Sequence, residues 1–195
     1  MRNFETKKEI ILDAALRLIV KQGSANVTIR EVAKEANVNV AAINYYFSSK
    51  DQMLAEMEKL FKDNFDEAFA ILDRVDICGE EKLLEWLNSA LAYAVHYPGI
   101  IVLLREKMIV GVGNPVNAEM LNQLMVRVGQ VRMLFNEVLG LPPESIDMFT
   151  MFASTIMWPF VVSPMIFGMD ESYKDRDVRD KYFKYVLDFF KNKKQ

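Results

Sequence analysis

The sequence contains a single cysteine, Cys78, and a single histidine, His96, among its 195 residues. One cysteine cannot form an intramolecular disulfide, and a zinc site or a Cys–His nucleophile pair would need ligands or partners that are missing. The six prolines and eight glycines are too few and too scattered for a collagen-like or low-complexity chain. The N-terminal residues are charged and lack the apolar stretch of a secretory signal. We therefore expect a cytoplasmic protein that is not an enzyme and that holds no metal and no cofactor.

Charge is distributed unevenly along the chain. The formal net charge is −3, yet residues 1–50 carry eight basic and five acidic side chains, whereas residues 51–195 carry sixteen and twenty-two. Hydrophobic residues make up 51% of the chain, which is enough for a substantial core. A basic N-terminal part ahead of an acidic remainder predicts that a polyanion binds at the N-terminal end.

The spacing of apolar residues predicts an all-α fold of about nine helices, because i, i+3, i+4 repeats recur along the whole length and period-2 alternation is nearly absent. Three capping boxes, Thr6-x-x-Glu9, Thr28-x-x-Glu31 and Ser49-x-x-Gln52, each open a helix. Further helices are expected before Pro98, over about 100–110, from Pro115, and over about 144–166 and 175–192.

Residues 28–54 show the spacing of a helix-turn-helix motif. Two helices of about eight residues flank a three-residue turn, Asn37-Val38-Asn39. Asn37 stands where a left-handed turn is needed, which Asn tolerates, and Asn39 can cap the second helix. In such a motif the second helix enters the major groove, while the first helix offers its N-terminus to a phosphate.

These residues also resemble a known family. The stretch TIREVAKEANV from Thr28 to Val38, the cluster INYYF from Ile43 to Phe47, then Lys50 and Met53-Leu54, resemble the DNA-binding domain of the TetR (tetracycline-repressor-like) family. With the first helix, the resemblance covers about residues 6–55, whereas residues 56–195 match the family only in length and in their helical pattern. The family usually has Gly at position 37 and Tyr at position 44, so Asn44 changes a groove-facing contact.

The resemblance implies a one-component transcriptional regulator, a repressor that binds a pseudo-palindromic operator in double-stranded DNA. An N-terminal three-helix helix-turn-helix domain, residues 1–50, would read DNA, and a helical domain, residues 51–195, would dimerise and bind an effector. Carried over position by position, the family pattern assigns phosphate contacts to Thr28, Tyr45, Tyr46 and Lys50. It assigns base contacts to Asn39, Val40, Ala41 and Asn44.

The last two predicted helices favour a homodimer. Residues 148–169 contain no charged side chain, and this run of 22 residues is long enough to span a bilayer. However, acidic residues flank the run and Ser and Pro interrupt it, so a buried subunit interface is favoured over a membrane span. The expected interface residues are Thr155, Val178, Tyr182, Val186 and Phe189.

Twelve Met, thirteen Phe and two Trp residues suit a pocket for a small apolar or amphipathic effector, although ordinary core packing explains the same composition. The expected pocket residues, which interrupt apolar stretches of central helices, are Tyr93, His96, Arg105 and Trp158. Two alternatives stay open. One is a helical ligand-binding or scaffolding protein whose helix-turn-helix is purely structural. The other is an enzyme in the helical bundle, which would require turnover that depends on His96.

Overall fold

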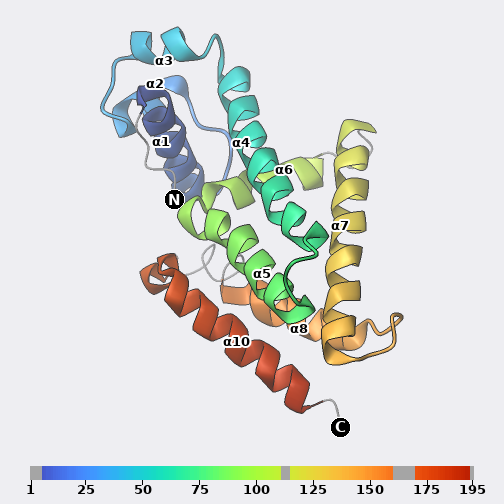
Figure 1. The fold of residues 1–195 in the computed structure, drawn as a ribbon. Helices are drawn as coiled ribbons and strands as arrows, with labels where there is room; N and C mark the ends of the chain where they lie inside the picture. Colours follow the sequence, from blue (N-terminus) through green and yellow to red (C-terminus); the bar gives the residue numbers. More distant parts are fainter. Residues whose placement is uncertain (1–5, 111–114, 160–169, 194–195) are drawn as a thin grey trace. The chain divides into compact units, whose positions relative to one another are not determined.

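The computed structural model describes residues 6–110, 115–159 and 170–193, apart from the side chains of residues 61, 104, 105, 107–110 and 115–121. Within these ranges the fold is all-α, with nine α-helices, two short 3-10 helices and no strand, as predicted (Figure 1). The α-helices are α1 (Lys7–Gln22), α2 (Ile29–Glu35), α3 (Val40–Tyr46), α4 (Lys50–Ala70), α5 (Gly79–His96), α6 (Gly99–Val110), α7 (Pro115–Leu139), α8 (Asp147–Met157) and α10 (Arg176–Asn192). The 3-10 helices are η1 (Ile71–Asp73) and η3 (Glu171–Lys174).

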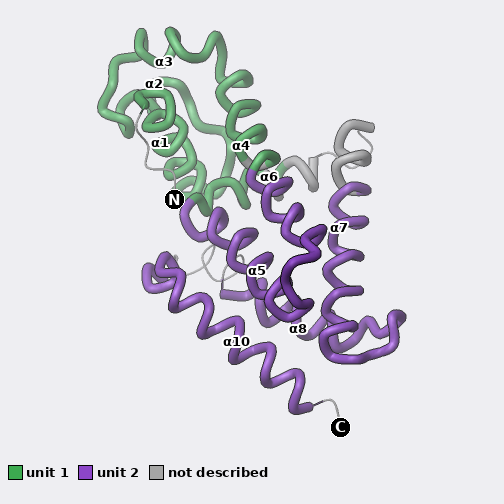
Figure 2. The backbone as a smooth tube through the Cα atoms, viewed as in Figure 1, with its two compact units in different colours: residues 1–63, 97–111 green, residues 64–96, 112–195 purple. Residues whose placement is uncertain are grey.

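The chain forms two compact units (Figure 2). Unit 1 consists of Met1–Asp63 and Tyr97–Gly111, and unit 2 consists of Asn64–His96 and Val112–Gln195. Unit 1 therefore contains more of the chain than the expected domain of residues 1–50, because it also includes the first part of α4 and the whole of α6.

Unit 1 is built on α1, which begins at the predicted capping box. The Thr6 hydroxyl accepts a hydrogen bond from the Glu9 amide, and α1 ends at Gly23 with a φ of 63°, the left-handed conformation that favours glycine. Helix α6 packs directly against α1, since a Cβ at Gly99 would lie 2.2 Å from the carbonyl oxygen of Leu16. An ion pair between Lys8 and Glu56, 2.9 Å apart, links α1 to α4.

Unit 2 is held by an aromatic core between α5, α7, α8 and α10. The rings of Phe135 and Phe152 stack with centroids 4.5 Å apart, and Phe190 packs against both. Arg179 is buried and donates hydrogen bonds to the carbonyl oxygens of Tyr173 and Lys174 and to Oδ1 of Asn88. This buried guanidinium ties η3 and α10 to α5.

The helix predicted over 144–166 begins later than expected, at Asp147. A turn precedes it, in which the side-chain amide of Asn136 donates to the carbonyl oxygens of Pro142, Pro143 and Ser145. The second half of that prediction, residues 160–169, lies outside the described residues. Among the helices that are described, none combines the length and the apolar character needed to cross a bilayer.

Candidate nucleic-acid interface

The N-terminus of α2 is organised by the predicted capping box. The Thr28 hydroxyl accepts a hydrogen bond from the Glu31 amide at 3.2 Å, and the Thr28 amide donates to the Glu31 carboxylate at 2.7 Å. These bonds with Thr28 hold the pKa of Glu31 below its usual value. The Thr28 side chain is exposed at the positive end of the helix, where its hydroxyl can still donate to a phosphate oxygen.

The turn between α2 and α3 adopts the predicted left-handed conformation. Asn37 has a φ of 53°, and the Val38 amide donates to the Ala33 carbonyl oxygen at 2.9 Å. Oδ1 of Asn39 then accepts the Ala42 amide at 2.7 Å and caps α3. Because Oδ1 serves as the cap, a base contact from Asn39 would come from its side-chain nitrogen, Nδ2.

Helix α3 has one buried side and one exposed side. Ile43 and, just past the helix, Phe47 are buried in unit 1. The residues on the opposite side, spaced to share one helix face, are exposed: Val40, Ala41, Asn44 and Tyr45. All four belong to the predicted DNA contacts, and none of them contributes a charge.

The two adjacent tyrosines occupy different environments. The Tyr45 side chain is 83% exposed, whereas Tyr46 is half-buried. The Tyr46 ring lies edge-on to Tyr45, with centroids 5.0 Å apart, and 6.4 Å from the Phe47 ring. Tyr46 therefore packs at the edge of the core, and Tyr45 stands clear of it.

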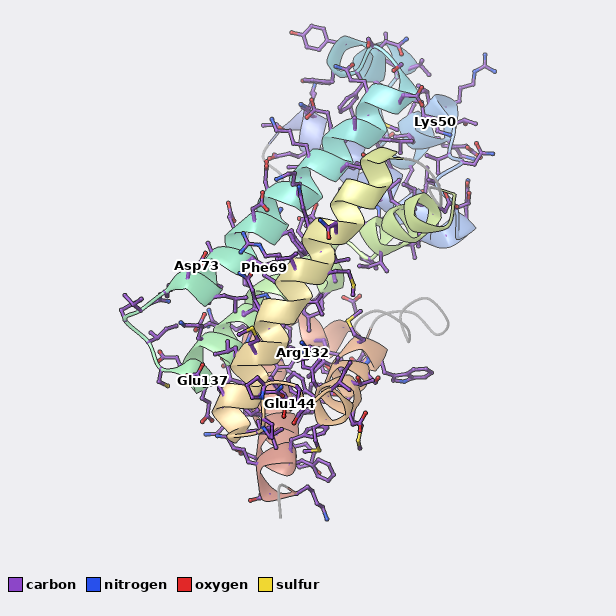
Figure 3. The ribbon with its side chains drawn as sticks, turned by 90° about the vertical axis from the view of Figure 1, so that its right-hand side faces the viewer. Lys50, Phe69, Asp73, Arg132, Glu137 and Glu144 are labelled. Carbon is purple, nitrogen blue, oxygen red and sulfur yellow. The ribbon has the colours of Figure 1, made fainter. Side chains whose placement is uncertain are left out.

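Lys50 lies at the first residue of α4 (Figure 3). The Ser49 hydroxyl accepts the Gln52 amide at 3.1 Å, as the predicted capping box requires, but the Gln52 side chain accepts from the amide of Ser48 instead of Ser49. Nζ of Lys50 donates to Oδ1 of Asn26 at 3.2 Å. This bond places the Lys50 ammonium beside the loop that leads into Thr28.

A further contact in this region was not predicted from the sequence. The Glu106 carboxylate of α6 accepts a hydrogen bond from the Ala25 amide at 3.0 Å, across 81 residues of sequence. The only available signal was that Glu106 is the one acidic residue in the segment GIIVLLREKMIV. That signal does not identify a partner.

The predicted dimer residues lie on α8 and α10. Thr155 is exposed, and its carbonyl oxygen accepts a hydrogen bond from the hydroxyl of the half-buried Tyr182 at 2.9 Å. Phe189 is 48% exposed, whereas Val186 is only 4% exposed and belongs to the core of unit 2. Val178 is half-buried. A charge at Val186 would therefore act on folding before it could act on any contact with a second copy.

The predicted effector residues are not all described. Tyr93 and His96 lie one turn apart on α5 in unit 2, and both are half-buried. Nδ1 of His96 lies 2.6 Å from the Ala92 carbonyl oxygen, so this ring nitrogen carries the proton and donates it. Trp158 directly follows α8 and is 54% exposed, and the side chain of Arg105 lies outside the described residues. The pocket stays a prediction.

Comparison with known proteins gives a family-model match in the N-terminal region and partial matches to known regulators. The family model described as bacterial regulatory proteins, tetR family, matches residues 11–57. The HTH-type transcriptional regulator BetI of Agrobacterium fabrum is 42% identical over 69 residues, which is 35% of this chain and 34% of that protein. The HTH-type transcriptional regulator PksA of Bacillus subtilis is 30% identical over 83 residues, 43% of this chain and 40% of that protein. The chain thus matches well under two thirds of the length of these relatives.

Solved structures resemble the chain over nearly its whole length. The probable transcriptional regulatory protein RHA5900 superposes with a TM-score of 0.68 at 17% identity. The superposition covers 93% of this chain and 97% of the RHA5900 chain. The ketosteroid transcriptional regulator KstR2 of Mycobacterium tuberculosis has a TM-score of 0.64 at 17% identity, with 95% of both chains covered. Such low identities show the fold alone. Residues 11–57 thus match the model of the tetR family of bacterial regulatory proteins, and the chain shares the fold of these solved structures.

Proposed function

We propose that this protein is a DNA-binding transcriptional regulator that acts as a repressor. It binds a pseudo-palindromic operator as a homodimer and is released from the operator by a small apolar effector. The exposed face of α3 is the observation that carries the proposal. Asn44 can pair with adenine through two hydrogen bonds, and Val40 and Ala41 can contact a thymine methyl group. Tyr45, which is 83% exposed beside this face, can donate its hydroxyl to a phosphate oxygen.

The surroundings of α3 suit a phosphate backbone. Thr28 lies at the positive N-terminus of α2, and Lys50 lies in the first turn of α4. The excess of basic side chains in residues 1–50 adds a sequence-independent attraction to DNA. Phosphate contacts orient the protein on the duplex, and the α3 face supplies sequence preference.

A homodimer follows from the symmetry of such an operator, because two half-sites related by a two-fold axis are read by two copies of α3. Helices α8 and α10 pack against each other, and their outer surface carries uncharged side chains together with the exposed Lys181 and Lys184. Thr155, Tyr185 and Phe189 are exposed there, and Tyr185, at 73% exposed, was not among the residues predicted from sequence. We assign the two-fold contact to this surface.

An effector would release DNA only by binding more tightly to a state that reads the operator poorly. The coupling is expected to be about 1–3 kcal/mol, and operator DNA must weaken effector binding by the same factor. A compound that raises the melting temperature of the free protein is therefore titrated against the operator complex. If stabilising compounds leave operator affinity unchanged, the effector part of the proposal fails, and a helical body that only dimerises remains.

Selection from a pool of random DNA duplexes tests the DNA-binding function itself. We expect enrichment of a pseudo-palindrome with half-sites about 34–36 Å apart or a multiple of that spacing. If binding occurs only at low salt and enriches no sequence, the scaffolding alternative with a structural helix-turn-helix is favoured instead.

Two substitutions then separate the assigned roles. Asn44→Ala should relax preference at one or two positions by about 1–3 kcal/mol, while Lys50→Ala should weaken all sequences similarly and lower the salt dependence. Asn26→Ala is the matched control, because it removes the Lys50–Asn26 hydrogen bond and keeps the cation. If Lys50→Ala and Asn44→Ala change the site preference in the same way, the assignment of roles is wrong.

A further inference from the structure

The loop between α1 and α2 is the segment that sets where α2 begins. It runs from Gly23, which ends α1, to Val27, which is fully buried. Inside it the Ser24 hydroxyl accepts the Asn26 amide at 3.1 Å. Thr28, the cap of α2, follows immediately. A displacement of this loop would therefore displace the N-terminus of α2.

Two side chains from distant parts of unit 1 hold this loop. Lys50 of α4 donates to the Asn26 side chain, and Glu106 of α6 accepts the Ala25 amide. The two bonds differ in kind. The hydrogen bond from Lys50 joins two side chains at an exposed site. The hydrogen bond to Glu106 is partly buried and comes from the backbone of the loop.

Glu106 lies on α6, which is packed against α1 within unit 1. Ile100, Val102 and Leu103 of α6 are buried, and Gly99 brings the α6 backbone against the backbone of α1 at Leu16. The Glu106 carboxylate thus accepts the Ala25 amide from a helix that is packed on α1. A hydrogen bond to a charged acceptor is stronger than one between neutral groups.

We propose that Glu106 is a positioning residue for DNA binding, which holds the α1–α2 loop by its backbone and so fixes where α2, the first helix of the helix-turn-helix, begins. This inference rests on the proposed DNA-binding function. Glu106 lies in α6, outside the helix-turn-helix, and needs no contact with DNA. Its effect is transmitted through Ala25 and the three residues that separate Ala25 from α2.

Three substitutions at this position test the role. Glu106→Gln keeps an oxygen at the same reach and should retain the bond, whereas Glu106→Asp is one methylene too short and Glu106→Ala has no acceptor. We expect Glu106→Ala and Glu106→Asp to weaken operator binding at least about fivefold. Glu106→Gln, whose neutral oxygen still accepts the amide, should lie between these variants and wild type. Glu144→Ala, at an exposed glutamate of unit 2 (Figure 3), is the matched control and should bind like wild type.

All affinities are measured at a temperature at which circular dichroism shows each variant to be folded, so a loss of stability alone does not change the result. Hydrogen exchange of the Ala25 amide is followed in the same variants without DNA. Faster exchange in the Ala and Asp variants, restored in Gln, is the expected result.

Equal operator binding by Glu106→Ala and wild type would overturn the positioning role, whatever the exchange shows. If the wild-type protein enriches no operator at all, the proposed function fails by itself. The exchange experiment then still decides whether Glu106 holds the loop: unchanged Ala25 exchange in Glu106→Ala overturns that, and faster exchange supports it.

Discussion

Replacing Gly99 with alanine should destabilise the protein strongly, because the space for a side chain is occupied by backbone. The added Cβ would lie 2.2 Å from the carbonyl oxygen of Leu16, 2.8 Å from its carbonyl carbon and 2.9 Å from its Cα. Backbone atoms inside α1 cannot rotate away as the end of a flexible side chain can. Helix α6 must therefore move away from α1.

The size of the effect follows from that distance. A carbon–oxygen contact of about 3.3 Å is the closest comfortable approach, so α6 has to shift by about 1 Å. Such a shift loosens Ile100, Val102 and Leu103, which are buried on the same helix. Overpacking typically costs about 1–3 kcal/mol, and we place Gly99→Ala at the upper end, near 3 kcal/mol. For a chain of this length that corresponds to a fall in melting temperature of about 6–12 °C.

Thermal unfolding followed by far-ultraviolet circular dichroism measures the change, with Gly129→Ala as the matched control. Gly129 lies inside α7, and a Cβ there would meet no atom within 4 Å. Alanine is favoured over glycine in a helix interior by about 0.5–1 kcal/mol. The same substitution should therefore raise the melting temperature at 129 and lower it at 99. A Gly99→Ala protein as stable as wild type would refute the direct packing of α6 on α1.

Three further predictions concern other parts of the chain. Thr28→Ala should destabilise α2 by about 1 kcal/mol at pH 7 in urea unfolding. The pKa of Glu31 is lowered in the folded state, so the stability that its carboxylate contributes is present above its ordinary pKa of 4.5 and is lost as the pH falls through the lowered pKa. The difference between the two proteins should therefore shrink in acid, and a constant difference would contradict this. Arg179→Met should lower the free energy of unfolding by about 3 kcal/mol or more, since it leaves the carbonyl oxygens of Tyr173 and Lys174 and the Asn88 side chain without their donor. A decrease below about 1 kcal/mol would show that these bonds contribute little. Thr155→Glu should give a folded monomer in sedimentation because Thr155 is exposed, whereas Val186→Glu should unfold the protein because Val186 is buried. A wild-type protein that is monomeric at micromolar concentration would exclude the dimer surface.

The helices and their ends were predictable because their causes lie within a few residues of each other. The capping boxes at Thr6 and Thr28 and the left-handed turn at Asn37 depend on bonds and backbone angles that close locally. The same holds for the two sides of α3, since the i, i+4 spacing alone separates Ile43 and Phe47 from Val40 and Asn44. The exposed α3 face could therefore be read from the sequence.

Tertiary structure decided what depends on distant segments. Along α10 the apolar stripe predicted from spacing contains both Val186 and Phe189, and only the packing of α10 on α5 and α8 determines that Val186 is buried and Phe189 is exposed. On a stripe that is apolar throughout, periodicity gives the angle between two side chains but not which of them faces the core. Likewise, helix spacing cannot show that α6 belongs with α1, or that Glu106 accepts the amide of Ala25, because those contacts join residues about eighty positions apart. Local chemistry thus determined the elements of this protein, and long-range packing determined which of their faces are available for function.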